Sequence, residues 1–270
     1  MKKTFLFLMA AALLGVGLSS CDKEDNNGGN NVDNNVVNNG DNNGDDNGDN
    51  GGNNGGDNGG DVNGGDTTTV QWVDLGLPSG LLWADRNVGA ESPEDYGNYY
   101  AWGETSPKEV YDWSTYAYGN DPHALTKYCK DSEYGLNGFT DNLTVLEASD
   151  DAATVNLGGD ARTPTYNEWH ELMNNTNSTW TTRNGVNGRL LTASNGNSIF
   201  LPAASCYSGS SNELAGLNGH YWSSEQSLIY QPFRPYFASE FYFVSNIQGA
   251  GPDALRSFGL SVRAVRAGQN

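Results

Sequence analysis

The sequence is poor in basic residues. Of its 270 residues 14 are lysine or arginine and 33 are aspartate or glutamate, which gives a formal net charge of −19 at pH 7. Binding to nucleic-acid phosphates depends on clustered lysine and arginine. We therefore do not expect nucleic acid as a partner, and the same acidity argues against a basic patch for anionic lipid headgroups.

Long apolar runs are missing as well. The run from Phe5 to Leu18 is too short to cross a hydrocarbon core of ~30 Å as a helix. It follows Lys2-Lys3 and leads into Leu18-Ser19-Ser20-Cys21. A charged start, a short apolar core and a small-residue end are typical of a removable signal peptide, here residues 1–20.

Cysteine is scarce, and the first cysteine is the most informative one. Leu18-Ser19-Ser20-Cys21 resembles a bacterial lipobox, in which the cysteine after the cut carries acyl chains such as palmitate. Each buried CH₂ contributes roughly 0.8 kcal/mol, so two or more chains anchor a protein stably. The acidic stretch Asp22–Asp25 resembles the signal that sends lipoproteins of one Gram-negative phylum to the outer face of the outer membrane. The alternative is an ordinary secretory signal with a chance cysteine.

Two cysteines remain, Cys129 and Cys206. An exported chain permits a disulfide between them. Two buried free thiols are the alternative, and the sequence leaves the choice open.

Between Asn26 and Asp66 the chain is almost entirely asparagine, glycine and aspartate. Such a segment has little to bury, so the entropy cost of ordering is not offset. We predict a disordered, lipidated tether over 21–69, with a root-mean-square span of about 35–40 Å. Its Asp-Asn-Gly-Gly repeats resemble calcium-binding repeats but lack the recurring apolar residue that those need.

The rest, 70–270, is predicted to be one α+β head with many short antiparallel strands. Asn184-Gly185, Asn187-Gly188 and Asn195-Gly196 favour tight hairpin turns, so the surrounding segments are expected to form a meander. The alternation of apolar residues within 257–265 is typical of a half-buried strand. The expected strands are Thr179–Thr182, Arg189–Ala193, Ser198–Leu201, His220–Ser224, Glu240–Ser245 and Ser257–Val265.

Two helices are predicted. Thr165 and Glu168 have the spacing of a capping box, and Trp169, Leu172 and Met173 follow on one apolar face. A shorter helix is expected after Asp150-Asp151, because carboxylates favour a helix N-terminus.

An ordered set of motifs across roughly 70–267 resembles the FISUMP-type major paralogous domain. That family resembles the C-type-lectin-like fold and the fold of formylglycine-generating enzymes. The resemblance implies a secreted or surface lipoprotein of undefined biochemical role, with no catalytic residues or cofactor to carry over. The motifs are Val73–Ala84, Asn87–Ala90, Tyr99–Glu104, Asp150–Ala153, Arg162–Thr165, Asn197–Ala204, Tyr221–Ser224 and Ser261–Arg263.

The enzymatic interpretations find little support. The formylglycine generators use a close cysteine pair late in the domain, and residues 221–270 contain no cysteine. His170-Glu171 would need a second histidine at position 174, which is Asn174, to form a zinc-protease helix. We expect no metal, cofactor or catalytic set. Carboxylate pairs such as Glu94-Asp95 or Asp150-Asp151 leave an undetected glycan hydrolase as a third hypothesis.

Binding is the leading hypothesis. Trp102, Glu104, Tyr111 and Trp113 form an aromatic, acid-containing stretch, and aromatic faces beside carboxylates suit sugar rings. The alternative is that the tryptophans of the recurring motifs, Trp102 included, belong to the core.

We therefore expect a surface-exposed lipoprotein, held to the outer membrane by its lipid, with a non-enzymatic recognition or adhesion head. Its partner would be a glycan or a surface protein. The second hypothesis is a structural or assembly component of a surface layer or fimbria.

Overall fold

The computed structural model describes residues 69–227 and 234–268, and of 251–252 the backbone only. The predicted signal peptide, Cys21 and nearly all of the predicted tether lie outside the described residues. The elements are β1 (Trp72–Asp74), β2 (Leu82–Asn87), β3 (Tyr99–Tyr100), α1 (Ala152–Leu157), α2 (Tyr166–Asn175), β4 (Thr176–Arg183), β5 (Val186–Ala193), β6 (Ser198–Pro202), β7 (Asn218–Gln226), β8 (Phe237–Val244), β9 (Gln248–Leu255), β10 (Leu260–Ser261) and β11 (Arg263–Arg266), with short 3₁₀ turns at Leu136–Gly138 and Ala148–Asp150.

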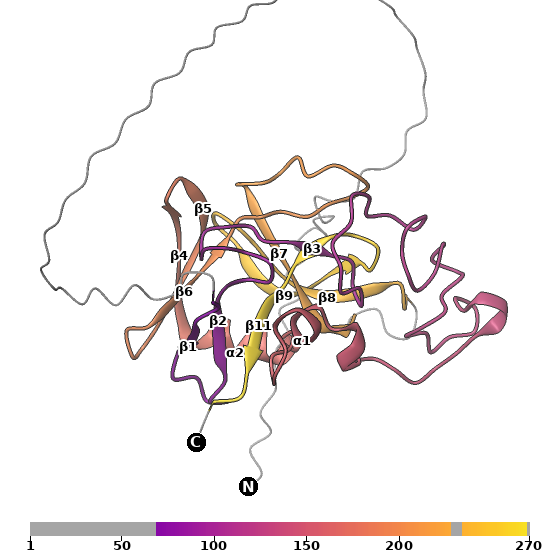
Figure 1. The fold of residues 1–270 in the computed structure, drawn as a ribbon, viewed down its shortest axis with the longest axis horizontal. Helices are drawn as coiled ribbons and strands as arrows, with labels where there is room; N and C mark the ends of the chain where they lie inside the picture. The colour runs from indigo at the N-terminus through magenta and orange to yellow at the C-terminus, as the bar shows by residue number, and fades with distance from the viewer. Residues whose placement is uncertain (1–68, 228–233, 269–270) are drawn as a thin grey trace, which may run out of the picture. The chain divides into compact units, whose positions relative to one another are not determined.

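Among these residues the head is mostly β-sheet with two α-helices (Figure 1). The strands form three sheets, in the orders β1-β2-β11, β3-β10-β7-β8-β9 and β4-β5-β6. Nearly all strand pairs are antiparallel, and β10 with β7 is parallel. The strand that opens the described head, β1, thus shares a sheet with the strand that closes it, β11.

The predicted meander is confirmed as β4-β5-β6. Asn184 and Gly185 both have positive φ, 48° and 83°, as a tight hairpin turn needs. Gly196 makes the second turn with φ 87°. The turn predicted at Asn187-Gly188 is wrong, because these residues lie inside β5.

Both helices are confirmed. The Thr165 hydroxyl accepts from the Glu168 N–H, and the Glu168 carboxylate accepts from the Thr165 N–H, so the capping box is complete. Trp169 and Leu172 are fully buried. Asp151 caps α1 by accepting from the Ala153 and Thr154 amides.

The strand predicted over Ser257–Val265 differs from what the structure shows. Two short strands, β10 and β11, form in place of the single predicted strand, and they belong to different sheets. It is buried on both faces rather than on one, since all its residues from Ser257 to Val265 are buried. The cause is its central place: Leu260 packs in one hydrophobic cluster and Val265 in another.

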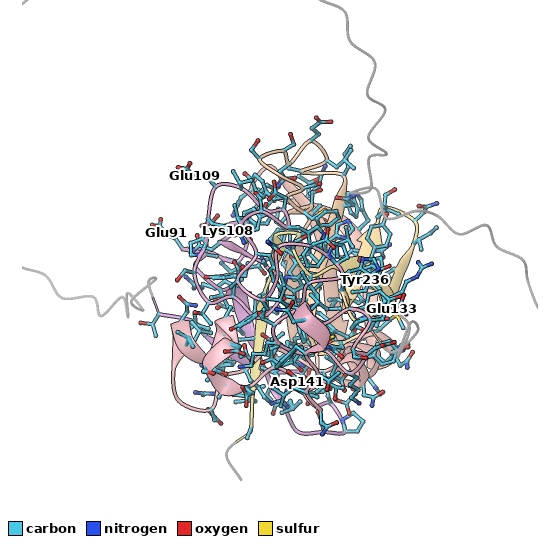
Figure 2. The ribbon with its side chains drawn as sticks, turned by 90° about the vertical axis from the view of Figure 1, so that its right-hand side faces the viewer. Glu91, Lys108, Glu109, Glu133, Asp141 and Tyr236 are labelled. Atoms are coloured by element: carbon cyan, nitrogen blue, oxygen red, sulfur yellow. The ribbon has the colours of Figure 1, made fainter. Side chains whose placement is uncertain are left out.

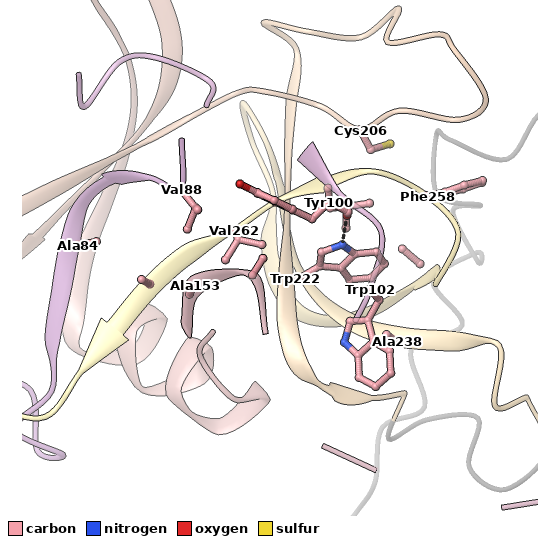
Figure 3. Packing of buried hydrophobic residues seen from close by; sticks show 14 of the residues in the cluster. Ala84, Val88, Tyr100, Trp102, Ala153, Cys206, Trp222, Ala238, Phe258 and Val262 are labelled. Carbon is pink, nitrogen blue, oxygen red and sulfur yellow. Dashed lines mark hydrogen bonds between the residues drawn. The ribbon is translucent and has the colours of Figure 1, made fainter. Parts of the chain in front are cut away.

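The recurring-motif tryptophans hold the core together. Trp83, Trp102 and Trp169 are 0% exposed and Trp222 is 2% exposed. Trp222 donates its indole N–H to the Tyr100 carbonyl at 2.7 Å, which fixes β7 against β3 (Figure 3). The core interpretation of these tryptophans is therefore confirmed.

Candidate functional site

The predicted binding stretch does not form an exposed surface. Trp102 is fully buried and donates its indole N–H to the Ser223 carbonyl at 2.9 Å. Tyr111 is 2% exposed, and its hydroxyl donates to the Tyr99 carbonyl at 2.6 Å. The prediction that these two aromatics contact a ligand is wrong for this structure, because both are packed inside hydrophobic clusters.

The other two predicted residues also serve the local structure. Glu104 forms an ion pair with Lys108 at 2.8 Å and accepts from the Ala117 amide at 2.8 Å. Trp113 is half-buried, with its ring centroid 5.4 Å from that of Tyr116 in an edge-to-face contact. Tyr111 and Trp113 do meet in one small cluster around Tyr116. The Tyr111 and Tyr116 rings at its centre are 2% and 6% exposed, so the cluster presents little aromatic surface to solvent.

A small cavity lies between Trp102, Glu104, Asp150 and Trp222. Its volume is about 10 Å³, which is the space of roughly one water molecule. A sugar ring does not fit there in this conformation.

The Asp150-Asp151 pair is committed to structural contacts. Asp150 accepts from the Lys127 ammonium and the Tyr128 hydroxyl, both at 2.6 Å. Burial alone would raise the pKa of Asp150, but these hydrogen bonds outweigh it and hold the pKa below its usual value. Asp151 caps α1 and also accepts from the Thr163 amide and hydroxyl.

The second carboxylate pair, Glu94-Asp95, is likewise occupied. Glu94 pairs with Arg183 at 3.5 Å. Asp95 accepts from the backbone amides of Glu91 and Gly97 and so closes a turn.

The described residues contain no group of three or more histidine, cysteine, aspartate or glutamate side chains that could hold a metal ion. His170 packs on Tyr166, with 4.5 Å between ring centroids. His220 is buried beside Glu240, with 2.7 Å between Nδ1 and Oε2.

Of the two alternatives left open by the sequence, the disulfide between Cys129 and Cys206 does not form. Cys129 is a buried free thiol whose Sγ donates to the Asp131 carbonyl at 3.1 Å. Burial raises the pKa of this thiol. Cys206 is 3% exposed and packs in the cluster around Trp222.

A different aromatic group does face solvent. His123, Tyr134 and Tyr236 form what we call the aromatic platform. The His123 and Tyr134 rings stack at 4.8 Å with an interplanar angle of 21°, and the Tyr134 and Tyr236 centroids are 5.6 Å apart. The His123 side chain is 58% exposed, and both tyrosines are partly exposed. Because these three neighbouring rings remain accessible to solvent, the aromatic platform differs from the buried aromatic clusters described above.

Two similar turns present the platform. The Asp121 carboxylate accepts from the His123 amide at 2.8 Å, and the Asp131 carboxylate accepts from the Glu133 amide at 3.0 Å. Aspartate favours such turns because its short side chain can bond the backbone two residues on. The turns lie in the long loop region that extends to one side of the sheets in Figure 1.

Leu125 joins these turns into one unit. It is fully buried, its amide donates to the Tyr134 carbonyl at 2.9 Å, and its carbonyl accepts from the Leu136 amide at 2.8 Å. Asp141 closes the loop by accepting from the Tyr128 and Cys129 amides. The loop is thus tied together by backbone bonds although it has almost no regular secondary structure.

The rim of the platform is charged. Glu133 lies beside Tyr236 at the edge of the head (Figure 2). Partial desolvation and then the Glu133 carboxylate raise the pKa of Tyr134, with Arg234 acting in the opposite direction. At neutral pH the Tyr134 phenol is therefore protonated and can donate a hydrogen bond. Exposed apolar side chains, Leu136 and Phe139, extend the surface.

The sequence held a signal for the platform that our prediction did not use. Tyr134 follows charged residues and precedes the glycines Gly135 and Gly138. An aromatic residue in such a turn-rich loop often faces solvent. Tyr111 and Trp113 carry nearly the same local signal, so the choice between the two stretches depended on long-range packing. Tyr236 follows Arg234-Pro235, far away in sequence.

No protein-family model, curated protein or solved structure matches this chain. In the described part of the chain, each helix falls short of the length and apolar character that spanning a membrane requires.

Proposed function

We propose that this chain is an outer-membrane lipoprotein, anchored through Cys21 and facing outward, whose head recognises a ligand without chemical turnover. The ordered motifs across the head, its mostly antiparallel sheets and its two helices support membership of the FISUMP-type family and a C-type-lectin-like fold. The predicted tether would let the head reach past the crowded membrane surface.

The aromatic platform is the observation that carries the recognition role. Sugars offer apolar C–H faces, which pack on aromatic rings, and hydroxyl groups, which bond carboxylates and phenols. Tyr134 and Tyr236 supply the rings, and Glu133 supplies a carboxylate at their rim. We therefore propose a glycan as the ligand class. The acidic surface favours a neutral or basic glycan over an anionic one.

The pre-formed shape of the loop supports this role. A site that is already ordered loses less conformational entropy when it binds. Arg256 donates to the Lys127 and Tyr128 carbonyls of the loop and to the Pro235 carbonyl next to Tyr236, which fixes both parts of the platform to one buried side chain.

A glycan array probed with the full chain tests the proposal, followed by titration calorimetry on the best glycan. We expect Tyr134→Ala and Tyr236→Ala each to weaken binding by about two- to tenfold, since one aromatic contact contributes roughly 0.5–1.5 kcal/mol. Tyr166→Ala is the matched control, because Tyr166 packs on His170 of α2 outside the platform.

Two results would contradict the proposal. Binding that survives the Tyr134→Ala, Tyr236→Ala double variant would place recognition elsewhere on the head. No binding on the array, together with co-purification of the full chain with a surface-layer or fimbrial component, would favour the structural or assembly role.

A further inference from the structure

The three-stranded sheet carries a row of three residues with opposite charges at its ends. Asp74 of β1 pairs with Leu82 of β2, and Leu82 pairs with Arg266 of β11. Partners in register point to the same face of a sheet, and neighbouring strands lie about 4.8 Å apart. The Cα atoms of Asp74 and Arg266 therefore lie about 10 Å apart across the sheet, with an apolar residue between them. Figure 1 shows the three strands side by side.

A cavity of about 480 Å³ opens over this row. Its walls are largely backbone, because Gly76, Gly80 and Gly268 line it. A Cβ at Gly268 would lie 2.5 Å from the Gly80 carbonyl oxygen, whereas a Cβ at Gly80 would meet no atom within 4 Å. The chain after β11, at Gly268, thus approaches the β1–β2 loop closely, and the space beside Gly80 stays open. The volume lies within the ~300–1,000 Å³ range of small-ligand sites.

Arg266 supplies a cation with unused donors at one end of the cavity. Its guanidinium carbon lies 4.6 Å from the Trp72 ring centroid, which fixes the plane of the group. Within the described residues it has no hydrogen bond or ion pair, and its Nε is shielded from solvent without a partner. Other arginines donate to or pair with protein oxygens: Arg86, Arg162, Arg183, Arg189, Arg256 and Arg263. A guanidinium held in this way suits a planar carboxylate.

Asp74 supplies the opposite charge at the other end. It is exposed, and its Oδ1 accepts from the Gly76 amide at 2.7 Å, which holds the carboxylate in one orientation. The Asp74 carbonyl accepts from the Asn195 and Asn197 side-chain amides at 2.9 and 2.7 Å. The position of this acid is therefore fixed from two sides.

We propose that this cavity binds a short peptide by its two free ends, with the terminal carboxylate on Arg266 and the terminal ammonium on Asp74. An extended chain spans about 3.3–3.6 Å per residue, so about three residues match the ~10 Å between the backbones of the two outer strands. The backbone-lined walls leave room for small side chains and give little selection among them. This site uses none of the residues of the aromatic platform and does not depend on the proposed function.

Titration calorimetry of the full chain with trialanine tests the proposal directly. We expect saturable 1:1 binding that weakens at least tenfold with N-acetyl-trialanine and, separately, with trialanine amide. These probes remove one ligand charge each while the protein stays unchanged, so the result does not depend on a variant that folds.

Two variants then assign the ends. Arg266→Gln should abolish the difference between trialanine and its amide. Asp74→Asn, which keeps an acceptor for the Gly76 amide, should abolish the difference between trialanine and its acetylated form. Arg183→Gln, at an arginine outside the cavity, is the matched control and should bind like wild type. No saturable binding at millimolar trialanine, or equal binding of all three peptides, would overturn the proposal.

Discussion

The guanidinium carbon of Arg256 lies 5.0 Å from the ring centroid of Trp102, and both side chains are fully buried. The same guanidinium donates to the Tyr116 hydroxyl and to the carbonyls of Lys127, Tyr128 and Pro235. The buried guanidinium of Arg256 thus links a tryptophan of the core to the loop that carries the aromatic platform. Neutral oxygens and aromatic rings surround it where a carboxylate would be the usual partner.

Arg256→Met should destabilise the head by about 3 kcal/mol or more, because it removes the donor of the Lys127 and Pro235 carbonyls and of the buried Tyr116 hydroxyl. Urea unfolding followed by tryptophan fluorescence measures the change. Hydrogen exchange should rise most in 119–141. Arg183→Met, at a partly exposed arginine that pairs with Glu94, should cost less than about 1 kcal/mol. Equal costs for the two variants would show that the buried contacts of Arg256 contribute little.

The predictions of both helices and of the turn at Asn184-Gly185 succeeded because their causes are local. The capping box needs only Thr165 and Glu168, three residues apart. The hairpin at Asn184-Gly185 needs only residues that accept positive φ. Such features can be predicted from a short window of sequence.

The predicted binding residues Trp102 and Tyr111 are buried, because the exposure of a side chain depends on contacts with residues that are distant in sequence. Tyr111 and Tyr134 both stand in loops rich in turn residues. Tyr111 is buried because Gly259, far away in sequence, leaves room for its ring: a Cβ there would lie 2.6 Å from the Tyr111 ring. Tyr134 stays partly exposed although it contacts both His123 of the same loop and Tyr236, which is far away in sequence. Only the tertiary structure distinguishes the two tyrosines.

Asp253 should make stability depend on pH. Burial raises its pKa to about 6, although the hydroxyls of Ser227 and Ser239 donate to it, and Glu240 adds repulsion. The folded state therefore holds a proton that the unfolded state has released above pH ~4. The contribution of this group to stability is greatest below pH ~4, falls as the pH rises from about 4 to 6, and stays low above that.

Asp253→Asn removes this dependence, because an amide does not titrate and can still bond both serines. We expect the variant to be more stable than wild type by about 1–2 kcal/mol at pH 7, with the difference growing between pH 4 and pH 6. Urea unfolding of both proteins at pH 4, 5, 6 and 7 measures it. A difference that is constant over this range would mean that Asp253 titrates normally.

Cys129 should resist alkylation in the folded protein. Its side chain is fully buried, and the raised pKa keeps it as a thiol, whereas the thiolate is the reactive form. Brief treatment with iodoacetamide at pH 8, followed by peptide mass spectrometry, should leave Cys129 unmodified in the native state and modify it fully in urea. A peptide containing Cys129 linked to Cys206 in the unreduced digest would contradict the structure.

Gly135→Ala should distort the aromatic platform. A Cβ at this position would lie 1.8 Å from the Phe139 carbonyl oxygen, so the backbone of the loop has to move. The movement passes to Tyr134, the preceding residue, whose carbonyl holds the Leu125 amide. We expect a loss of about 2–3 kcal/mol in stability and faster hydrogen exchange at the Leu125 and Leu136 amides.

Gly138→Ala in the same loop is the matched control for this substitution. Gly138 has φ +79°, and a Cβ there would meet no atom within 4 Å. It should therefore cost only the strain of a positive φ, about 1 kcal/mol, and leave exchange at Leu125 unchanged. If Gly138→Ala perturbed Leu125 as strongly as Gly135→Ala, the close approach of Gly135 to Phe139 would not be what fixes the platform.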